Sequence, residues 1–180
     1  PLSNNNIALF IGRFQPFHKG HLEVIKRIST EFSIIKIAIG SSQEAHTPKN
    51  PFSVQERRAM IELVLEKKSI KNYELFEVPD IGDNSKWVEH TLKYVGKIDV
   101  VVSGNKLVKT LFEQKNYAVQ WINERYFGII AEQIRKKINE QTSWKELVDP
   151  IVYQLIQKLD GEERIKHLTI DLNNIDLKRD

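Results

Sequence analysis

Apolar residues along this chain alternate between short runs typical of buried strands and stripes typical of amphipathic helices. Ile7–Ile11 is apolar on both faces, as expected for a strand inside a parallel sheet. Gly12 and Pro16 mark a loop, and from His18 onward apolar residues recur at helical spacing, at Leu22, Val24, Ile25 and Ile28. A second β-branched run at 33–39 completes a strand–helix–strand unit, which predicts the start of a doubly wound sheet with right-handed crossovers.

The same alternation continues toward the C-terminus. Further strands are predicted at 73–78, 98–102 and 117–121, and the helices between them begin near Ser53, near Asn84 or Ser85, and near Lys106. From Ile130 to about residue 168 the pattern is helical, and residues 169–180 have the composition of a frayed or strand-like tail.

We therefore expect an α/β fold, with a doubly wound, Rossmann-like parallel sheet of about five strands and a helical C-terminal extension. The length of 180 residues predicts a single domain, residues 1–180, with a core at about 6–125 and a helical part at about 130–168.

Composition narrows the class of protein. With 41% hydrophobic and 28% charged residues the chain resembles an ordinary soluble domain. The absence of cysteine excludes disulfides, thiolate metal sites and a cysteine nucleophile, and it fits a reducing compartment, so we expect a cytoplasmic protein. A net charge of only +3, with both signs mixed along the chain, argues against a nucleic-acid partner, and no apolar run has the length of a membrane span.

The candidate chemistry lies in residues 12–21, GRFQPFHKGH, which join the first strand to the first helix. A helix N-terminus favours bound phosphate, and His18 and His21, three residues apart, project from the same side of the first turn. Their rings can donate hydrogen bonds to phosphate oxygens, and Gly20 leaves the backbone open to close approach. The stretch predicts a triphosphate site, and the alternative is a structural turn with two solvated histidines.

This stretch resembles the HxGH signature of the nucleotidylyltransferase superfamily, and its GRxQPxHxGH form is similar to the archaeal-type nicotinamide mononucleotide adenylyltransferases. The resemblance extends to about His167. It implies an enzyme that transfers the adenylyl group of ATP to the 5′-phosphate of nicotinamide mononucleotide, forming NAD and pyrophosphate. It also implies that Mg²⁺ accompanies ATP without a dedicated metal site in the protein. Because several transferases share HxGH, a flavin or pantetheine phosphate acceptor stays open, and so does a homo-oligomeric state.

Carried over residue by residue, the resemblance assigns roles to particular side chains. His18, His21, Arg13 and Arg135 are the implied catalytic residues. The implied ATP-binding residues are these four together with Phe10, Ile11, Gly12, Gln15, Lys49, Ser103, Gly104 and Asn105. The implied nicotinamide-binding residues are Asp80, Ile81 and Trp87, and a tryptophan face over a cationic ring is a favourable pairing.

The chain also departs from the family pattern. Lys49 stands in place of an arginine, which keeps the charge but loses the bidentate fork. Ile130 and Glu132 stand where the family has hydroxyl residues ahead of Arg135, and a carboxylate there repels phosphate. These departures leave open a nucleotide-binding regulator with weakened catalysis. Arg57 and Arg58, in the helix that begins near Ser53, are expected to be solvated surface residues.

Overall fold

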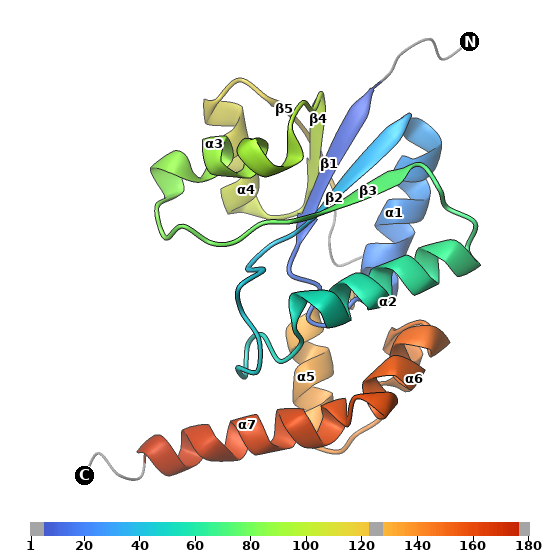
Figure 1. The fold of residues 1–180 in the computed structure, drawn as a ribbon, viewed down its shortest axis with the longest axis vertical. Coiled ribbons are helices and arrows are strands. Elements are labelled where there is room, and N and C mark those ends of the chain that lie inside the picture. The colour runs from blue at the N-terminus through green and yellow to red at the C-terminus, as the bar shows by residue number, and fades with distance from the viewer. Residues whose placement is uncertain (1–5, 123–127, 177–180) are drawn as a thin grey trace.

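The computed structural model describes residues 6–122 and 128–176, and it contains a five-stranded sheet in which each adjacent pair of strands is parallel (Figure 1). The strands are β1 (Ile7–Gly12), β2 (Ile34–Ile39), β3 (Tyr73–Glu77), β4 (Val100–Ser103) and β5 (Ala118–Trp121). Their spatial order is β3-β2-β1-β4-β5, so the winding reverses between β1 and β4. This confirms the predicted doubly wound fold, in which ligands bind at the carboxyl ends of the strands beside such a reversal.

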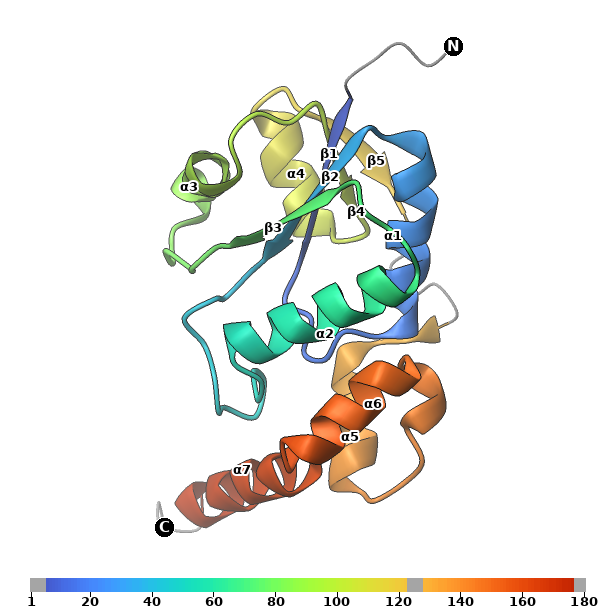
Figure 2. The same ribbon diagram turned by 45° about the vertical axis from the view of Figure 1, so that its right-hand side comes forward.

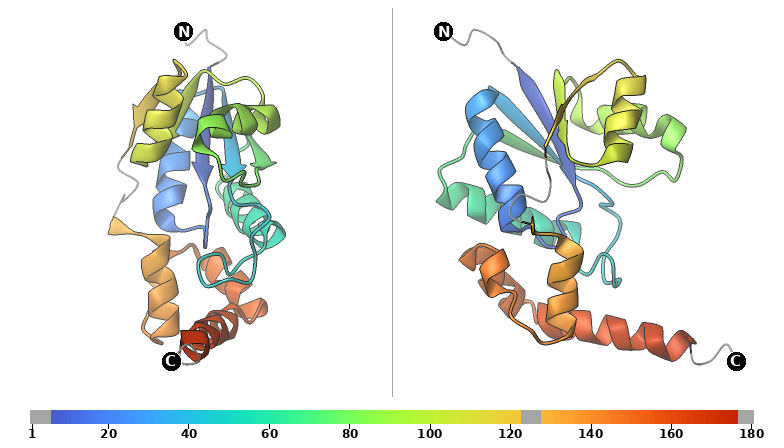
Figure 3. Two further views of the ribbon diagram at one scale, coloured as in Figure 1. Left: turned by 90° about the vertical axis from the view of Figure 1, so that its left-hand side faces the viewer. Right: turned by 180° about the vertical axis from the view of Figure 1, so that it is seen from behind.

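Helices cover both faces of the sheet. One face carries α1 (Lys19–Glu31) and α2 (Val54–Lys67), and the other carries α3 (Asn84–Val95) and α4 (Lys106–Gln114) (Figures 1 and 3). The alternation of side chains along β1 explains this arrangement: Ala8 and Phe10 belong to the apolar cluster with α1 and α2, whereas Leu9 belongs to the cluster with α3 and α4. A strand buried on both faces accounts for the continuous apolar run.

The C-terminal helices form a group beside the carboxyl end of the sheet (Figure 2). They are α5 (Ala131–Asn139), the 3₁₀ turn η2 (Lys145–Leu147), α6 (Pro150–Lys158) and α7 (Gly161–Asp176). An ion pair of 2.6 Å between Arg164 Nη1 and Glu56 Oε2 joins α7 to the first turn of α2. A Cβ at Gly161 would lie 2.7 Å from Cγ2 of Ile156, so the close packing of α6 on α7 requires glycine there.

Several predicted boundaries are wrong. The expected frayed or strand-like tail at 169–180 is helical as far as Asp176, because α7 continues through it, and residues 177–180 lie outside the described part. The Thr169 hydroxyl donates to the Ile165 carbonyl at 3.0 Å, so a residue expected outside the helix bonds along it. The strand predicted at 98–102 runs from Val100 to Ser103. The strand predicted at 117–121 begins one residue later, at Ala118, and ends at Trp121 as predicted.

Two further expectations concern the end of the core and the absence of a membrane span. The predicted end of the core, at about residue 125, falls within 123–127, which are outside the described residues. Within the two described ranges, no helix combines the length and the hydropathy that crossing a membrane requires.

Candidate active site

A cavity of about 720 Å³ lies at the carboxyl ends of the strands, within the size range of small-molecule sites. Its walls come from the loop after β1, the ends of β2 and β5, the loop after β3, and the starts of α4 and α5. The lining includes these residues predicted from the sequence: Phe10, Ile11, Gly12, Arg13, Gln15, His18, His21, Asp80, Trp87, Gly104, Asn105 and Arg135. The fold thus brings together side chains that are up to 125 positions apart, from Phe10 to Arg135.

Three of the predicted residues are not part of this lining as described. Lys49 and Ile81 lie exposed on loops, and Ser103 is buried at the end of β4. The Ser103 hydroxyl accepts a hydrogen bond of 3.0 Å from the Asn105 N–H, so it shapes the turn into α4. Contacts of these three residues with a nucleotide stay predictions that the cavity does not support.

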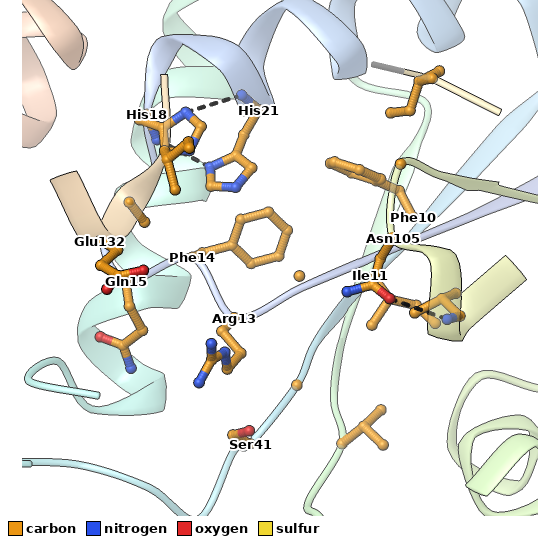
Figure 4. Close-up of a pocket in the computed structure, with 18 of the residues that line it drawn as sticks. Phe10, Ile11, Arg13, Phe14, Gln15, His18, His21, Ser41, Asn105 and Glu132 are labelled. Carbon is orange, nitrogen blue, oxygen red and sulfur yellow. Dashed lines mark hydrogen bonds between the residues drawn. The ribbon is translucent and has the colours of Figure 1, made fainter. Parts of the chain in front are cut away.

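His18 and His21 form a reciprocal cap at the start of α1 (Figure 4). The His21 N–H donates to His18 Nδ1 at 3.3 Å, and the His18 N–H donates to His21 Nδ1 at 3.2 Å. The two rings stack with their centroids 3.6 Å apart. Because both Nδ1 atoms accept, each neutral ring carries its proton on Nε2, which is the donor left for a ligand.

The protonation of the pair follows from its surroundings. Burial lowers the pKa of His18 to about 4, and burial together with the charge of His18 lowers the pKa of His21 well below 6.5. Both rings are therefore neutral near pH 7 in the ligand-free protein. A second proton would have to go on Nδ1, which already accepts a backbone N–H, so the cap itself favours neutral rings that donate through Nε2.

Acid is expected to destabilise the protein through this pair. Since the folded pKa of His18 lies below the value of 6.5, the unfolded chain binds more protons as the pH falls from about 6.5 to about 4. We expect His18 alone to remove about 2 kcal/mol from the free energy of unfolding between pH 7 and pH 5. Urea unfolding at the two pH values should show a smaller loss for His18→Asn, which retains an N-cap residue. The control His167→Asn, at an exposed position of α7, should lose as much as the wild type, and an equal loss in all three proteins would contradict the assignment.

Aromatic packing holds His21 in place. The Phe14 ring meets His21 edge-on at 4.8 Å, and the Phe17 ring is parallel to the His21 ring with 5.8 Å between centroids. Phe14 has a φ of 55°, an unusual conformation for a bulky residue. A Cβ at Gly12 would lie 2.9 Å from Cζ of Phe14, so Gly12 makes room for this ring. Gly12 thus has a packing role in addition to the ATP contact that the resemblance implies.

Gln15 ties the loop after β1 to two other segments. Its side-chain Nε2 donates to the Phe52 carbonyl and its Oε1 accepts from the Phe52 N–H, both at 2.9 Å. Arg135 Nη1 donates to the Gln15 carbonyl at 2.8 Å, which connects α5 to the same loop. Since the Gln15 amide is already paired, its part in nucleotide binding would be to position its neighbours.

Arg57 is fully buried, so the expectation that it is a solvated surface residue is wrong. Its guanidinium donates to the carbonyls of Arg13 at 2.9 Å, Gly40 at 2.8 Å and Ser41 at 3.1 Å. The sequence did contain a signal, since Arg57 lies in the apolar stripe of α2 that also contains Val54, Ile61 and Val64. Arg58, by contrast, is partly exposed and pairs with Glu62 on the helix surface, as expected.

Positive charge gathers at one end of the cavity. Burial first and the neighbouring Arg13 second lower the pKa of Arg57 to about 10, and the same two causes lower the pKa of Arg135. Figure 4 shows the Arg13 side chain in the space between Gln15 and Ser41. Mutual repulsion of these guanidinium groups is relieved by a bound anion, so this end suits a polyphosphate. Glu132 opposes this effect, because its charge raises the pKa of Arg135.

The part of the cavity wall formed by the loop after β3 and by α3 contains Asp80 and Trp87. Gln43 holds the loop after β3 in place, since its Nε2 donates to Asp80 Oδ2 and its Oε1 accepts from the Asp80 N–H, both at 3.0 Å. The Trp87 ring packs edge-on against Phe112 with 5.7 Å between centroids, and Trp87 also lines the cavity. Thr91, one helical turn further along α3, lines the cavity as well, and the sequence reasoning did not single it out as a site residue.

The end of the cavity near α4 is formed by backbone and a second tryptophan. Asn105 caps α4, since its Oδ1 accepts from the Leu107 N–H at 2.9 Å and the Val108 N–H at 3.2 Å (Figure 4). Its side-chain oxygen therefore acts mainly in positioning the turn. Trp121, at the end of β5, lines the cavity and is 47% exposed, and it too was missed as a site residue.

Comparison with known proteins shows which protein family and which enzymes this chain is similar to. A family model described as cytidylyltransferase-like matches residues 9–155. A nicotinamide-nucleotide adenylyltransferase of Thermoplasma acidophilum is 42% identical over 165 residues, which cover 90% of this chain and 91% of that protein. Another of Methanococcus aeolicus is 42% identical over 167 residues, covering 91% of this chain and 95% of that protein.

A solved structure shares the fold. The bifunctional NMN adenylyltransferase/ADP ribose pyrophosphatase of Francisella tularensis, complexed with AMP and a Mn ion, matches with a TM-score of 0.74 at 24% identity. The match covers 97% of this chain and 56% of that chain, so this chain spans little more than half the length of the bifunctional protein. At this identity the likeness concerns the fold alone.

Proposed function

The chain belongs to the cytidylyltransferase-like family and, within it, to the nicotinamide-nucleotide adenylyltransferases, and from that premise we propose how it makes NAD. It transfers the adenylyl group of ATP to the 5′-phosphate of nicotinamide mononucleotide. The observation that carries the assignment of roles is the stacked His18–His21 pair at the N-terminus of α1, inside a cavity that Arg13, Arg135 and Trp87 also line.

The reaction needs alignment more than proton transfer. An oxygen of the mononucleotide phosphate forms a bond to the α-phosphorus of ATP, and the bond from that phosphorus to the bridging oxygen breaks, releasing pyrophosphate. The attacking phosphate is already ionised near pH 7, so no general base is required. His18 and His21 donate through Nε2 to oxygens of the α-phosphate, and Arg13 and Arg135 neutralise the leaving pyrophosphate.

The two nucleotides occupy opposite parts of the cavity in this proposal. The adenosine lies toward Gly104 and Asn105, and the nicotinamide lies toward Asp80 and Trp87. The half-buried Trp87 supports this orientation, because an indole face attracts a cationic pyridinium ring. Asp80 adds negative charge at the same end, which favours a cationic ring with a neutral amide over one with a carboxylate.

A divalent ion, Mg²⁺ by preference, would arrive with the ATP phosphates. Among the described residues no group of three or more His, Asp or Glu side chains could hold a metal, so water and phosphate oxygens would supply most of its ligands. Among the described residues, Glu132 and Asp80 are the carboxylates that line the cavity. The ion would add charge neutralisation to the donors that the protein provides.

Adenylyl transfer to a set of acceptors tests the proposal directly. With ATP and Mg²⁺, we expect pyrophosphate release with nicotinamide mononucleotide and little with flavin mononucleotide or phosphopantetheine. A preference for either of the other acceptors would overturn the nicotinamide assignment. The cytoplasmic location, self-association and single-domain organisation expected from the sequence stay predictions.

A second candidate function is a nucleotide-binding regulator with weakened catalysis. The observation behind it is that Ile130 and Glu132 line the cavity beside Arg135, and Ile130 provides no side-chain hydrogen bond as the N-cap of α5. Calorimetry that shows tight binding of NAD, together with no pyrophosphate release from the two substrates, would favour the regulator.

Removing the charge of Glu132 is expected to improve ATP binding. Because Glu132 lies at the phosphate end of the cavity, Glu132→Gln should lower the KM for ATP about threefold at low salt, and the difference should shrink at high salt. Steady-state kinetics at two ionic strengths provide the measurement. Glu140→Gln, at the other end of α5, is the matched control and should leave the KM unchanged. A higher KM in Glu132→Gln would mean that this carboxylate assists nucleotide binding.

A further inference from the structure

Thr91 is a buried hydroxyl residue in the wall of the cavity. It is completely inaccessible to solvent, and its Oγ1 has no hydrogen-bond partner among the described residues. It lies on the core-facing side of α3 between Val88 and Val95, which are both buried. An unpaired hydroxyl in such surroundings costs roughly 1–3 kcal/mol, so its presence calls for an explanation.

Three other helical hydroxyls of this chain are satisfied within their own helices. Ser29 donates to the Lys26 carbonyl at 2.7 Å, Thr30 to the Arg27 carbonyl at 2.8 Å, and Thr169 to the Ile165 carbonyl at 3.0 Å. Such bonds to a carbonyl three or four residues back are the usual way to satisfy a hydroxyl within a helix. Thr91 makes no bond of this kind, and unlike those three residues it lines the cavity.

The position of Thr91 indicates which part of a ligand it can meet. It follows Trp87 by one helical turn, so both side chains lie on the same side of α3, and both line the cavity. The helix starts near the carboxyl end of the sheet and runs back along it, which places Thr91 deeper than Trp87. A flat base held against Trp87 therefore has Thr91 below it, toward the core.

We propose that the Thr91 hydroxyl hydrogen-bonds to the carboxamide of the nicotinamide ring and helps to select that acceptor. The inference rests on the proposed function and adds a specificity-determining residue to it. A hydroxyl can donate to the amide oxygen or accept from the amide nitrogen, so it suits either orientation of the group. Because the hydroxyl is buried, an acceptor without a polar substituent leaves it unpaired and binds less well.

Thr91→Val tests the contact, because valine has nearly the same shape and lacks the hydroxyl. We expect the KM for nicotinamide mononucleotide to rise about tenfold while the KM for ATP stays unchanged. Thr91→Ser keeps the hydroxyl and should restore the KM to within about threefold of the wild type. With the mononucleotide whose carboxamide is replaced by hydrogen, wild type and Thr91→Val should have the same kcat/KM.

Thermal unfolding of the ligand-free proteins separates this role from a structural one. Removal of an unpaired hydroxyl breaks no hydrogen bond, so Thr91→Val should unfold at the same temperature as the wild type or higher. Thr169→Val, the matched control, loses its bond within α7, should unfold at a lower temperature and should keep both KM values.

Several results would overturn the inference about Thr91. They are an unchanged KM for nicotinamide mononucleotide in Thr91→Val, an equal loss of kcat/KM with the analogue that lacks the carboxamide, and a lower unfolding temperature without a kinetic effect. Failure of the proposed function has a different signature, because the wild type itself would then release no pyrophosphate with nicotinamide mononucleotide.

Discussion

Replacing His18 and His21 together by alanine is expected to reduce kcat/KM for NAD synthesis by about a thousandfold. Each ring offers one Nε2–H donor to the α-phosphate, and the two rings are stacked 3.6 Å apart as a unit. Removal of one preorganised donor typically costs a factor of about 100 or more, and donors that act together are not additive. Each single variant should therefore show most of the loss seen in the double variant. Steady-state assays of pyrophosphate release provide the measurement.

A fall in activity from unfolding must be separated from this effect. The two histidines also cap α1, so their loss is expected to cost about 1 kcal/mol of stability, which urea unfolding would reveal. The control His167→Ala, at an exposed position of α7, should keep full activity. If the double alanine variant is folded and makes NAD at the wild-type rate, the assignment of the pair to catalysis is wrong.

Local patterns were sufficient to predict this pair. His18 and His21 are three positions apart, so the geometry of one helical turn places them together whatever the rest of the chain does. The loop residues Gly12 to Pro16 and the apolar run before them identify the strand and the turn in the same way. For that reason the centre of the candidate site could be predicted from residues 7–28, whereas the fold class also needed the second strand at 33–39 and the alternation that follows it.

Arg57 and Thr91 could not be assigned from local patterns alone. Each occupies a core-facing position of its helix, and that much is visible in the spacing of the apolar residues around it. What each side chain meets depends on other segments: Arg57 bonds to carbonyls at 13, 40 and 41, and Thr91 meets a cavity closed by five or more loops and helix ends. Lys49 stays a prediction that follows from a family position, because the lining as described includes Gly40 and Ser41 at the start of its loop and does not include Lys49 itself.

Arg57 is expected to be among the residues most important for stability. Arg57→Met should lower the free energy of unfolding by about 3–5 kcal/mol, because the carbonyls of Arg13, Gly40 and Ser41 would lose their donors while buried. Urea unfolding at pH 7 provides the measurement. Arg57→Lys keeps the charge with fewer donors and should fall between the two proteins.

The neighbouring Arg58 is the matched control for this prediction. It lies on the same helix, is partly exposed and pairs with Glu62 and Glu77, so Arg58→Met should cost less than about 1 kcal/mol. Equal losses in Arg57→Met and Arg58→Met would show that the buried guanidinium does not hold the strand ends together.

A large loss confined to Arg57→Met would support a link between the stability of the fold and the shape of the phosphate site. The carbonyls that Arg57 binds lie at the ends of β1 and β2, where Arg13 and Ser41 form the wall of the cavity, so the same bonds that stabilise the fold also set the shape of the phosphate site.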